Sequence, residues 1–341
     1  MTIMDKQIRD IKVSVIVTTY NQAETIGRTL DSILAQKCDF TYEIIIGEDC
    51  STDSTLSVCR TYAEKYPYII RLIENVTNKG LRDNYYDCIL RCAGDYIADC
   101  AGDDYWIDPL KLQKQHDILE ANPKVTLVHT DWEFYDVSTG KTSPSDPKGE
   151  KTQFRKPIVH GSDLLLPIIS HEASPIVHLC SAMYRKSAII QAYGADQYPF
   201  RHPGFPCEDI QLIAALASMG DIAYIPDVTL LYTVGECSVS NTPDSGKTFD
   251  FYYGSLELTC YLAEKYGLNL SLLNRHAVKT LQFIMAQAFN GTDRERRRRF
   301  IEMPYRRRFP TGIKTRMMLI LSSIRPLWRL CAYLNTQLHH G

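Results

Sequence analysis

The chain has 341 residues, a length that fits one large domain with an appendage or two domains. Apolar residues make up 45% and charged residues 23%, ordinary values that exclude collagen, mucin and multi-span membrane proteins. The net charge of −2 shows no bias toward nucleic acid, and we expect no nucleic-acid partner. We expect no signal peptide and no membrane-spanning helix, since no uncharged apolar run reaches the roughly 20 residues that a span needs.

The eleven cysteines indicate the compartment. Their number is odd and they form no Cys-x-x-Cys pair. Cys88 and Cys92 lie four residues apart on a predicted helix and could ligate a metal, but no second Cys/His pair lies nearby in the sequence. We therefore interpret them as small buried hydrophobic residues. Reduced thiols are typical of a cytoplasmic protein.

The first hundred residues alternate between predicted strands and predicted helices. The β-branched run over residues 11–20 predicts a strand buried on both faces of a sheet. Asn21 is expected to cap the next helix, with Glu24 at the capping-box position, and Asp53 to cap the one after it. This alternation is the pattern of a doubly wound α/β sheet. The other elements expected here are strands at 42–47, 69–73 and 95–100 and helices at 53–66 and 81–93.

The second part of the chain mixes strands with helices and then becomes mostly helical from about Phe249. The segment 138–157 is rich in Lys, Ser, Pro and Gly and is predicted to be a mobile loop. We place a boundary between 235 and 246, so that a first domain covers residues 1–240 and a helical C-terminal region covers 247–341. The elements expected here are strands at 124–136, 176–186 and 222–234, a helix at 110–122 and a helix from near Cys207.

Polar clusters follow three of the predicted strands. Ligands bind at the carboxyl ends of parallel strands, because loops and helix N-termini gather there. Carboxylates at this edge suit a divalent cation and the cation suits a phosphate, although each acid could instead be a helix cap. Neither G-x-G-x-x-G nor G-x-x-x-x-G-K-[ST] occurs, which argues against hydride transfer and ATP hydrolysis. The clusters are Thr18 to Asn21, then Glu48, Asp49, Ser51 and Asp53, and finally Asp103 with Asp104.

The last fifty residues are strongly basic. Between Gly291 and Arg329 there are twelve Lys/Arg and three Asp/Glu, and an apolar-rich stretch follows the arginines. This order favours contact with an anionic membrane surface, with cations near head groups and apolar side chains in the interface. A solvated helix face or a nucleic-acid patch is the alternative, although aromatic residues for base stacking are few. The interfacial side chains would be Met317, Leu321, Ile324, Leu327, Trp328 and Leu330.

Four ordered motifs carry a family resemblance: VSVIVTTYNQAETIGRTLDSILAQ, EIIIGEDCSTDST, NKGLRDN and GDYIADCAGDDYWIDPLKLQKQ. In this order and spacing they resemble the inverting family 2 glycosyltransferases with the GT-A fold. The match is close over residues 12–115 and looser to about 240. It implies an α/β fold of GT-A type that binds a nucleotide sugar, with a mostly parallel, Rossmann-like central sheet followed by a helical C-terminal region.

The resemblance implies a nucleotide-sugar donor bound over the sheet edge. Each position implied also has a structural alternative: Tyr20 could close a turn and Gly80 could supply a positive φ. By similarity, Thr19 and Tyr20 would lie against the base, Asp49 would hydrogen-bond it, Asp53 would support that loop, and Asn78, Gly80 and Asn84 would line the donor site.

The metal motif of the family is altered in this chain. The family holds Mg²⁺ or Mn²⁺ with an Asp-x-Asp motif, and here Ala101 stands at the first acid while Asp103 stands at the second, with Asp104 adjacent. One carboxylate with phosphate oxygens and waters can hold the ion, so we expect weak metal binding without donor. A second departure is Thr233 and Gly235, where relatives often have Arg and His.

The resemblance places the catalytic base in CEDIQL. The acceptor hydroxyl must lose its proton as it attacks the anomeric carbon, on the face opposite the leaving diphosphate. By similarity Asp209 is this base, and Glu208 beside it would orient acceptor or base. Alternatively both acids only cap a helix. Glycoside hydrolysis also uses two carboxylates, but the nucleotide-type edge at Asp49 argues against it.

We therefore expect an inverting glycosyltransferase of the hexosyl- or N-acetylhexosaminyltransferase class. It would move a sugar from a nucleoside diphosphate sugar, with UDP-sugars as the first expectation, to a hydroxyl of a glycan or lipid-linked glycan in cell-surface polysaccharide synthesis. A cytoplasmic enzyme on the inner face of the cell membrane fits the basic tail. The alternative is a catalytically degenerate sugar-nucleotide-binding module that acts in partner assembly, which Ala101 and Gly235 favour.

Overall fold

The computed structural model describes residues 11–170, 175–235, 244–289 and 294–307, with 309, 313, 316, 317, 320, 324 and 326 as single positions. The described residues fall into two compact units. The first contains the chain up to His202 and Cys207–Gly235, and the second contains Pro203–Pro206 and the chain from Glu236 onward.

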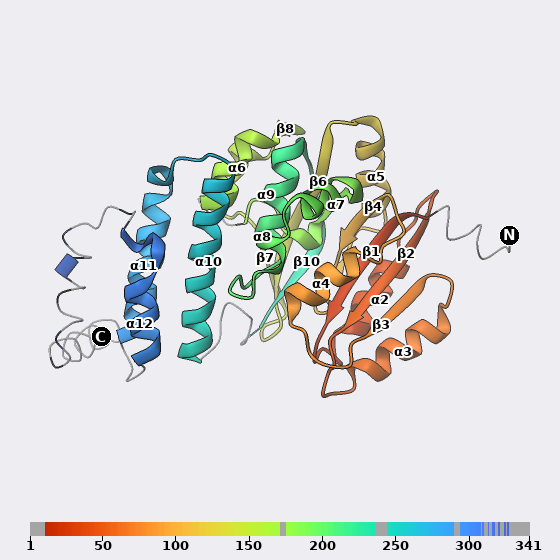
Figure 1. The fold of residues 1–341 in the computed structure, drawn as a ribbon. Coiled ribbons are helices and arrows are strands. Elements are labelled where there is room, and N and C mark those ends of the chain that lie inside the picture. Colours follow the sequence, from red (N-terminus) through yellow and green to blue (C-terminus); the bar gives the residue numbers. More distant parts are fainter. Residues whose placement is uncertain are drawn as a thin grey trace. The chain divides into compact units, whose positions relative to one another are not determined.

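A ten-stranded sheet forms the centre of the first unit (Figure 1). Its main path runs β3-β2-β1-β4-β9-β6-β10-β5. Strands β3, β2, β1 and β4 are parallel neighbours, and β6 and β10 are parallel to each other. Strand β9 is antiparallel to both β4 and β6, so six strands of the path share one direction. The path is β3 (Ile70–Glu74), β2 (Thr41–Glu48), β1 (Ile11–Thr19), β4 (Tyr96–Asp99), β9 (Ala182–Arg185), β6 (Val125–Asp136), β10 (Asp221–Val234) and β5 (Tyr105–Trp106), while β7 (Lys141–Pro144) pairs with β6 and β8 (Ile158–His160) with β10.

Helices cover both faces of this sheet, as expected for parallel strands that are buried on both sides (Figure 1). In β1, residues 13–17 are all buried. Ile26, Leu30 and Ile33 of α2 pack into one core cluster with alternate residues of β1 and β2. The predicted α/β fold class is confirmed. The helices are α2 (Ile26–Leu34), α3 (Thr55–Lys65), α4 (Leu81–Ile89), α5 (Lys111–Ala121), α6 (Gly161–Ser170), α7 (Lys186–Ala195), α8 (Tyr198–Arg201) and α9 (Asp209–Met219).

The predicted cap at Asn21 is wrong. Helix α2 begins at Ile26 with Thr25 as its N-cap residue. Asn21 has φ 53°, a left-handed conformation, and its Oδ1 accepts a hydrogen bond from the Thr52 backbone N–H at 2.8 Å. Asn21 therefore joins the loops after β1 and β2 instead of starting a helix. Asp53 lies two residues before α3, and its carboxylate accepts from the Thr55 backbone N–H at 2.9 Å.

Two other predicted elements differ from the structure. The segment 138–157 is not a plain loop, because β7 pairs with β6 and Arg155 forms a two-point ion pair with Asp131 at 2.9 and 3.0 Å. The strand expected at 176–186 is shorter. It begins only at Ala182, after a 3₁₀ turn at Leu179–Ser181.

The second unit is helical. Its helices are α10 (Ser245–Lys265), α11 (Asn274–Phe289) and α12 (Arg294–Glu302). Arg299 of α12 forms an ion pair with Asp250 of α10 at 2.6 Å. Within the described part of the chain, no helix has both the length and the apolar composition to cross a bilayer. The expected interfacial residues Leu321, Leu327, Trp328 and Leu330 lie outside the described residues.

The Arg155–Asp131 ion pair should contribute strongly to stability. The two side chains are 10% and 20% exposed, so Arg155→Leu leaves a largely buried carboxylate without its cation. We expect a loss of about 3 kcal/mol in the free energy of unfolding, measured by urea denaturation. Arg60→Leu is the matched control, because the Arg60–Glu74 pair has the same two-point geometry but is 54% and 40% exposed. It should cost less than about 1 kcal/mol. Equal losses in both variants would contradict this prediction.

Candidate active site

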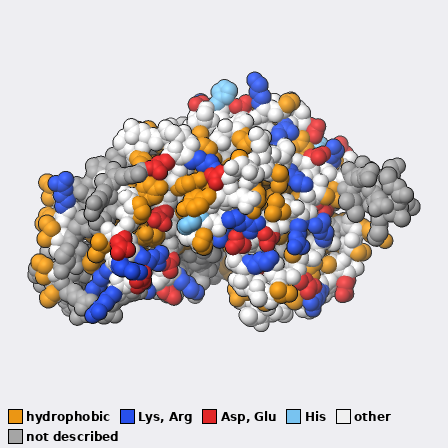
Figure 2. Space-filling model, viewed as in Figure 1, with side chains coloured by type: hydrophobic (Ala, Val, Ile, Leu, Met, Phe, Trp, Pro, Cys, Tyr) orange, Lys and Arg blue, Asp and Glu red, His pale blue; other side chains and the backbone are white. Residues whose placement is uncertain are grey.

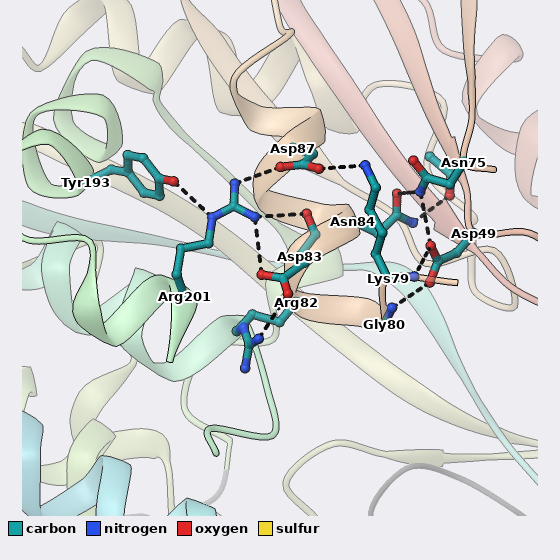
Figure 3. Close-up of polar contacts among 11 residues, drawn as sticks. Asp49, Asn75, Lys79, Gly80, Arg82, Asp83, Asn84, Asp87, Tyr193 and Arg201 are labelled. Atoms are coloured by element: carbon teal, nitrogen blue, oxygen red, sulfur yellow. Dashed lines mark hydrogen bonds and ion pairs between the residues drawn. The ribbon is translucent and has the colours of Figure 1, made fainter. Parts of the chain in front are cut away.

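Asp49 stabilises the loop that follows β3 by accepting hydrogen bonds from it. It comes directly after β2 and is buried. Its carboxylate accepts hydrogen bonds from Asn75 Nδ2 at 3.0 Å, from the Lys79 backbone N–H at 2.9 Å and from the Gly80 backbone N–H at 2.8 Å (Figure 3). Asn78 Nδ2 donates to the Asp49 carbonyl at 3.0 Å. Most of the acceptor capacity of Asp49 is therefore used inside the protein, and its expected hydrogen bond to a base stays a prediction.

Gly80 and Asn84 shape this loop from its end. Gly80 has φ 81° and ψ 157° at the start of α4, a conformation that residues with a Cβ rarely adopt. Asn84 is buried and lies behind the loop. Its Nδ2 donates to the Gly47 carbonyl at 2.8 Å and its Oδ1 accepts from Asn75 at 2.9 Å. The geometry gives Asn84 a supporting place, while Asn78 and Gly80 lie at the more exposed turn.

The loop after β1 lies against the loop after β4. Thr19 is buried and donates to Gln22 Oε1 at 2.8 Å, while Tyr20 is 44% exposed and available for a ligand. Gly102 is a close-approach glycine, since a Cβ there would collide with the side chains of Thr19 and Gln22. Asp53 supports the same loop by accepting from the Ala23 backbone N–H at 3.2 Å. Although burial alone would raise it, the pKa of Asp53 is lowered by its hydrogen bonds from Thr55 and Ala23.

Successive carbonyl groups of the Gly102–Asp104 loop accept hydrogen bonds from three side chains at the start of α2. Since residues three and four apart lie on one helix face, these donors form a row. Thr233 of β10 holds the other side of the loop, with its backbone N–H 2.9 Å from Asp104 Oδ1 and its hydroxyl 2.6 Å from the Asp103 carbonyl. The row consists of Thr25 Oγ1 to Gly102 O at 2.9 Å, Arg28 Nη2 to Asp103 O at 3.0 Å and Thr29 Oγ1 to Asp104 O at 2.6 Å.

The two acids of this loop have different surroundings. Asp104 is fully buried, with Oδ1 on Thr233 and Oδ2 without a hydrogen-bond partner among the described residues. Burial and the charge of Asp103 raise the pKa of Asp104 well above its usual value. Asp103 is only partly buried. Burial raises the pKa of Asp103 too, against the opposing effect of Gln22 and the positive charge of Arg28.

The different burial of Asp103 and Asp104 determines which of the two could bind a divalent cation. The carboxylate of Asp103 is partly exposed and could hold Mg²⁺ or Mn²⁺, whereas Asp104 is enclosed and bonded to the protein, which does not suit the predicted metal contact. The described residues contain no group of three or more His, Cys, Asp or Glu side chains that could hold a metal ion by themselves. Phosphate oxygens and waters would have to supply most of the ligands.

Glu208 and Asp209 begin helix α9. Asp209 Oδ1 accepts from the Ile210 backbone N–H at 2.8 Å, and Tyr86 donates its hydroxyl to the Glu208 carbonyl at 2.7 Å. Both side chains are partly exposed. Burial and the neighbouring charge of Asp209 raise the pKa of Glu208, and burial raises the pKa of Asp209. A carboxyl pair with raised pKa values suits proton transfer near neutral pH.

Tyr232 of β10 connects the acids after β4 with the acids of α9. Burial raises the pKa of its hydroxyl, and the negative charges of Asp104, Asp103 and Asp209 raise it further. Tyr232 thus lies near enough to the acids of both segments for their charges to act on its hydroxyl.

An ion-pair chain joins the loop around Asp49 to the segment before Glu208 (Figure 3). Arg201 of α8 donates to Asp87 at 2.8 Å and to Asp83 at 3.2 Å, and Tyr193 accepts from Arg201 Nε at 2.9 Å. Asp87 also receives Lys79 Nζ at 2.9 Å. Helix α4 thus carries acids that hold both segments in place.

The structure adds site residues that motif comparison did not single out: Gln22, Arg28, Asn75, Tyr86, Arg201 and Tyr232. Asn75 had one sequence signal, since it lies two residues after the predicted strand at 69–73, near the carboxyl end where the other polar clusters lie. Gln22 lies in the loop after β1, and the other four lie inside helices or strands, where the sequence gives no sign that a polar side chain faces the sheet edge.

The family assignment agrees with this site. The family model described as Glycosyl transferase family 2 matches residues 14–191, more than half of the chain. The chain belongs to glycosyl transferase family 2. The match includes the loops that carry Asp49 and Asp103, and it ends before the Glu208–Asp209 pair.

Relatives of this family 2 member match only in part. "Uncharacterized protein Rv1520" of Mycobacterium tuberculosis is 43% identical over 114 residues, 33% of this chain and 33% of that protein. The poly(ribitol-phosphate) beta-glucosyltransferase of Bacillus spizizenii is 35% identical over 98 residues, 28% of this chain and 15% of that protein. The matched part of the chain thus spans a third or less of the length of these relatives.

Solved structures support the GT-A fold of this family 2 member. TarS 1-349 of S. aureus, in complex with UDP-GlcNAc, superposes with a TM-score of 0.60 at 19% identity, covering 86% of this chain and 79% of that one. The mannosyltransferase PcManGT of Pyrobaculum calidifontis, in complex with GDP-Man and Mn²⁺, gives a TM-score of 0.53 at 19% identity, covering 93% and 87%.

Gly80 should be required for its backbone conformation. An alanine Cβ at Gly80 would have open space, so only the positive φ opposes it, and Gly80→Ala should cost about 1–2 kcal/mol of stability. Gly194→Ala is the matched control. It also has open space around its Cβ, but it lies inside helix α7 without a positive φ, so it should cost nothing. Thermal unfolding measures both, and an unchanged melting temperature for Gly80→Ala would contradict the prediction.

Proposed function

We propose that this chain is an inverting glycosyltransferase that moves a sugar from a nucleoside diphosphate sugar to a hydroxyl of a glycan or lipid-linked glycan. The proposal is carried by the match of the Glycosyl transferase family 2 model to residues 14–191, which include the loops of Asp49 and Asp103. Helix α4 contacts both ends of the candidate site, because the Gly80 backbone N–H at its start donates to Asp49 and Tyr86 donates to the Glu208 carbonyl. One end of the site offers a partly exposed acid for a metal and diphosphate, and the other offers an acid with a raised pKa for proton transfer.

The reaction would divide between these two ends. Asp209 accepts the proton of the acceptor hydroxyl as that oxygen attacks the anomeric carbon, and the bond to the diphosphate breaks on the opposite face. Asp103 would hold a Mg²⁺ or Mn²⁺, which supplies positive charge for the departing diphosphate. The hydroxyl of Tyr86 donates to the Glu208 carbonyl and so helps to orient the neighbouring catalytic base, Asp209. Tyr20 and the loop around Asp49 would hold the base of the nucleotide.

The structures that match in fold support the donor class. TarS is described in complex with UDP-GlcNAc and PcManGT in complex with GDP-Man and Mn²⁺. By its name, the poly(ribitol-phosphate) beta-glucosyltransferase transfers glucose to a poly(ribitol-phosphate), which favours a polymeric acceptor here. UDP-sugars are the first donors to test.

Asp209→Asn tests the base. Donor binding, measured by calorimetry, should stay within about twofold, while sugar transfer should fall by about 100-fold or more because the amide cannot accept the proton. Donor hydrolysis across a panel of nucleotide sugars identifies the substrate for this assay. Unchanged turnover would remove Asp209 from the role of base.

The pH dependence of the wild-type chain gives an independent test. The acid must be ionised to accept a proton, and a raised pKa moves the loss of its charge to higher pH. The acidic limb of kcat/KM should therefore have its midpoint above the ordinary carboxyl range, because burial raises the pKa of Asp209. Activity should rise with pH through this limb. A midpoint near 4 would show that no carboxyl with a raised pKa is essential.

A catalytically degenerate binding module is the second candidate. It is favoured by Ala101 at the position of the first metal acid and by Asp104, whose carboxylate is buried and bonded to Thr233. Such a module would bind a nucleotide sugar without hydrolysing or transferring it. The same calorimetry and hydrolysis panel separates the two candidates.

We also propose that the basic tail contacts an anionic membrane surface, on the inner face of the cell membrane. Ile313, Met317, Ile320 and Ile324 are 80%, 56%, 64% and 46% exposed, and they recur at a spacing of four, three and four residues, which is typical of the apolar face of an amphipathic helix. Hydrophobic side chains lie at the surface in this last part of the chain, and Lys and Arg side chains lie over the C-terminal helices (Figure 2). Exposed apolar residues beside arginines are typical of interfacial helices.

Vesicle binding tests the membrane proposal on the full chain. The double variant Ile313→Asn, Ile320→Asn should co-sediment at least about tenfold less with phosphatidylglycerol vesicles than the wild type, and phosphatidylcholine vesicles should bind neither. The control is Tyr68→Asn, Val76→Asn, which removes side chains that are 74% and 92% exposed from the first unit. Equal partitioning of all three proteins would refute the proposal.

A further inference from the structure

Arg28 lies beside the loop that carries Asp103. Its Nη2 donates to the Asp103 carbonyl at 3.0 Å and to Thr233 Oγ1 at 3.3 Å. The guanidinium carbon lies 4.0 Å from the ring centre of Tyr105, an arrangement that fixes the plane of the group. Helix α2 thus brings a fixed positive charge to the edge of the sheet where the acids gather.

Most of the donor capacity of Arg28 is not used by the protein. Its hydrogen bonds to the described residues all come from Nη2. The Nε atom is buried and has no hydrogen-bond partner among the described residues. A guanidinium carries five N–H donors in a planar fork, and this fork matches the oxygens of a phosphate. A polar group that is buried and unsatisfied costs free energy unless a ligand or water completes it.

The guanidinium of Arg28 lies at the backbone of the residue proposed to hold the metal, since its Nη2 is 3.0 Å from the Asp103 carbonyl oxygen. A donor diphosphate held through Asp103 would carry two to three negative charges beside this guanidinium. With Ala101 and Thr233 uncharged, Arg28 is well placed to supply part of the compensation.

We propose that Arg28 binds the diphosphate of the donor directly, as a second cation beside the metal held by Asp103. This inference rests on the proposed function and deepens it. Its consequence is that the chain retains phosphate affinity without a divalent cation. A site that depends on the metal alone would bind a nucleoside diphosphate no better than the bare nucleoside in EDTA.

The test compares ligands with and without phosphates on the full chain in EDTA. Calorimetry with UDP and GDP, and with uridine and guanosine, gives the part of the affinity that comes from the diphosphate. Arg28→Met should weaken binding of the preferred diphosphate about tenfold and leave the nucleoside unchanged. Arg28→Lys keeps the charge without the fork and should recover part of the loss. A misfolded or displaced loop would weaken nucleoside binding as well.

The controls separate this inference from the function on which it rests. Arg71→Met removes an arginine that is 51% exposed on β3, and it should not change UDP or GDP binding. If the wild type prefers a diphosphate over its nucleoside in EDTA and Arg28→Met keeps that preference, the role of Arg28 is wrong and the proposed function stands. If the wild type binds no nucleotide even with Mn²⁺, both proposals fail.

Discussion

Asp49 and Asp104 lie buried at the carboxyl edge of the sheet, and backbone N–H groups of other segments donate hydrogen bonds to both carboxylates. Asp49 takes two backbone N–H groups and an amide from the loop after β3, and Asp104 takes the backbone N–H of Thr233 in β10. Asp53 reaches back to Ala23 in the loop after β1. These bonds join loops that the sheet brings near one another but does not itself connect. The arrangement of these loops therefore depends on the hydrogen bonds that their carboxylates accept from one another's segments.

This constraint also divides roles between neighbouring acids. Asp103 and Asp104 are adjacent in sequence, yet one is partly exposed and the other is enclosed by Thr233 and the core. The enclosed acid holds the loop to β10, and the carboxylate of the other stays accessible to solvent. Ala101 stands where relatives have an acid, but the loop after β4 keeps its conformation without that acid. Side chains of α2 and β10 donate hydrogen bonds to the carbonyl groups of Gly102, Asp103 and Asp104.

The fold was largely predictable from the sequence, since continuous β-branched runs specify strands that are buried on both faces. The loops were less so. Asn21 is of a residue type that often caps helices, but its hydrogen-bond partner is Thr52 in the loop after β2. Only the pairing of β1 with β2 brings these two loops together. Arg155 looked like part of a polar loop because its partner Asp131 lies 24 residues earlier, inside a strand. Motif order located the acids, whereas their partners depend on tertiary contacts that local patterns do not contain.

The shared use of Asp87 has a consequence for how the protein can change over evolution. Its two oxygens hold Lys79 beside the loop of Asp49 and Arg201 in helix α8, which the proposed function assigns to the nucleotide and to the acceptor. A substitution that adapts one of these segments to a new substrate alters the ionic partner of the other. Donor preference and acceptor preference would then drift together, so a relative that has exchanged one sugar for another should carry compensating replacements on both flanks of helix α4.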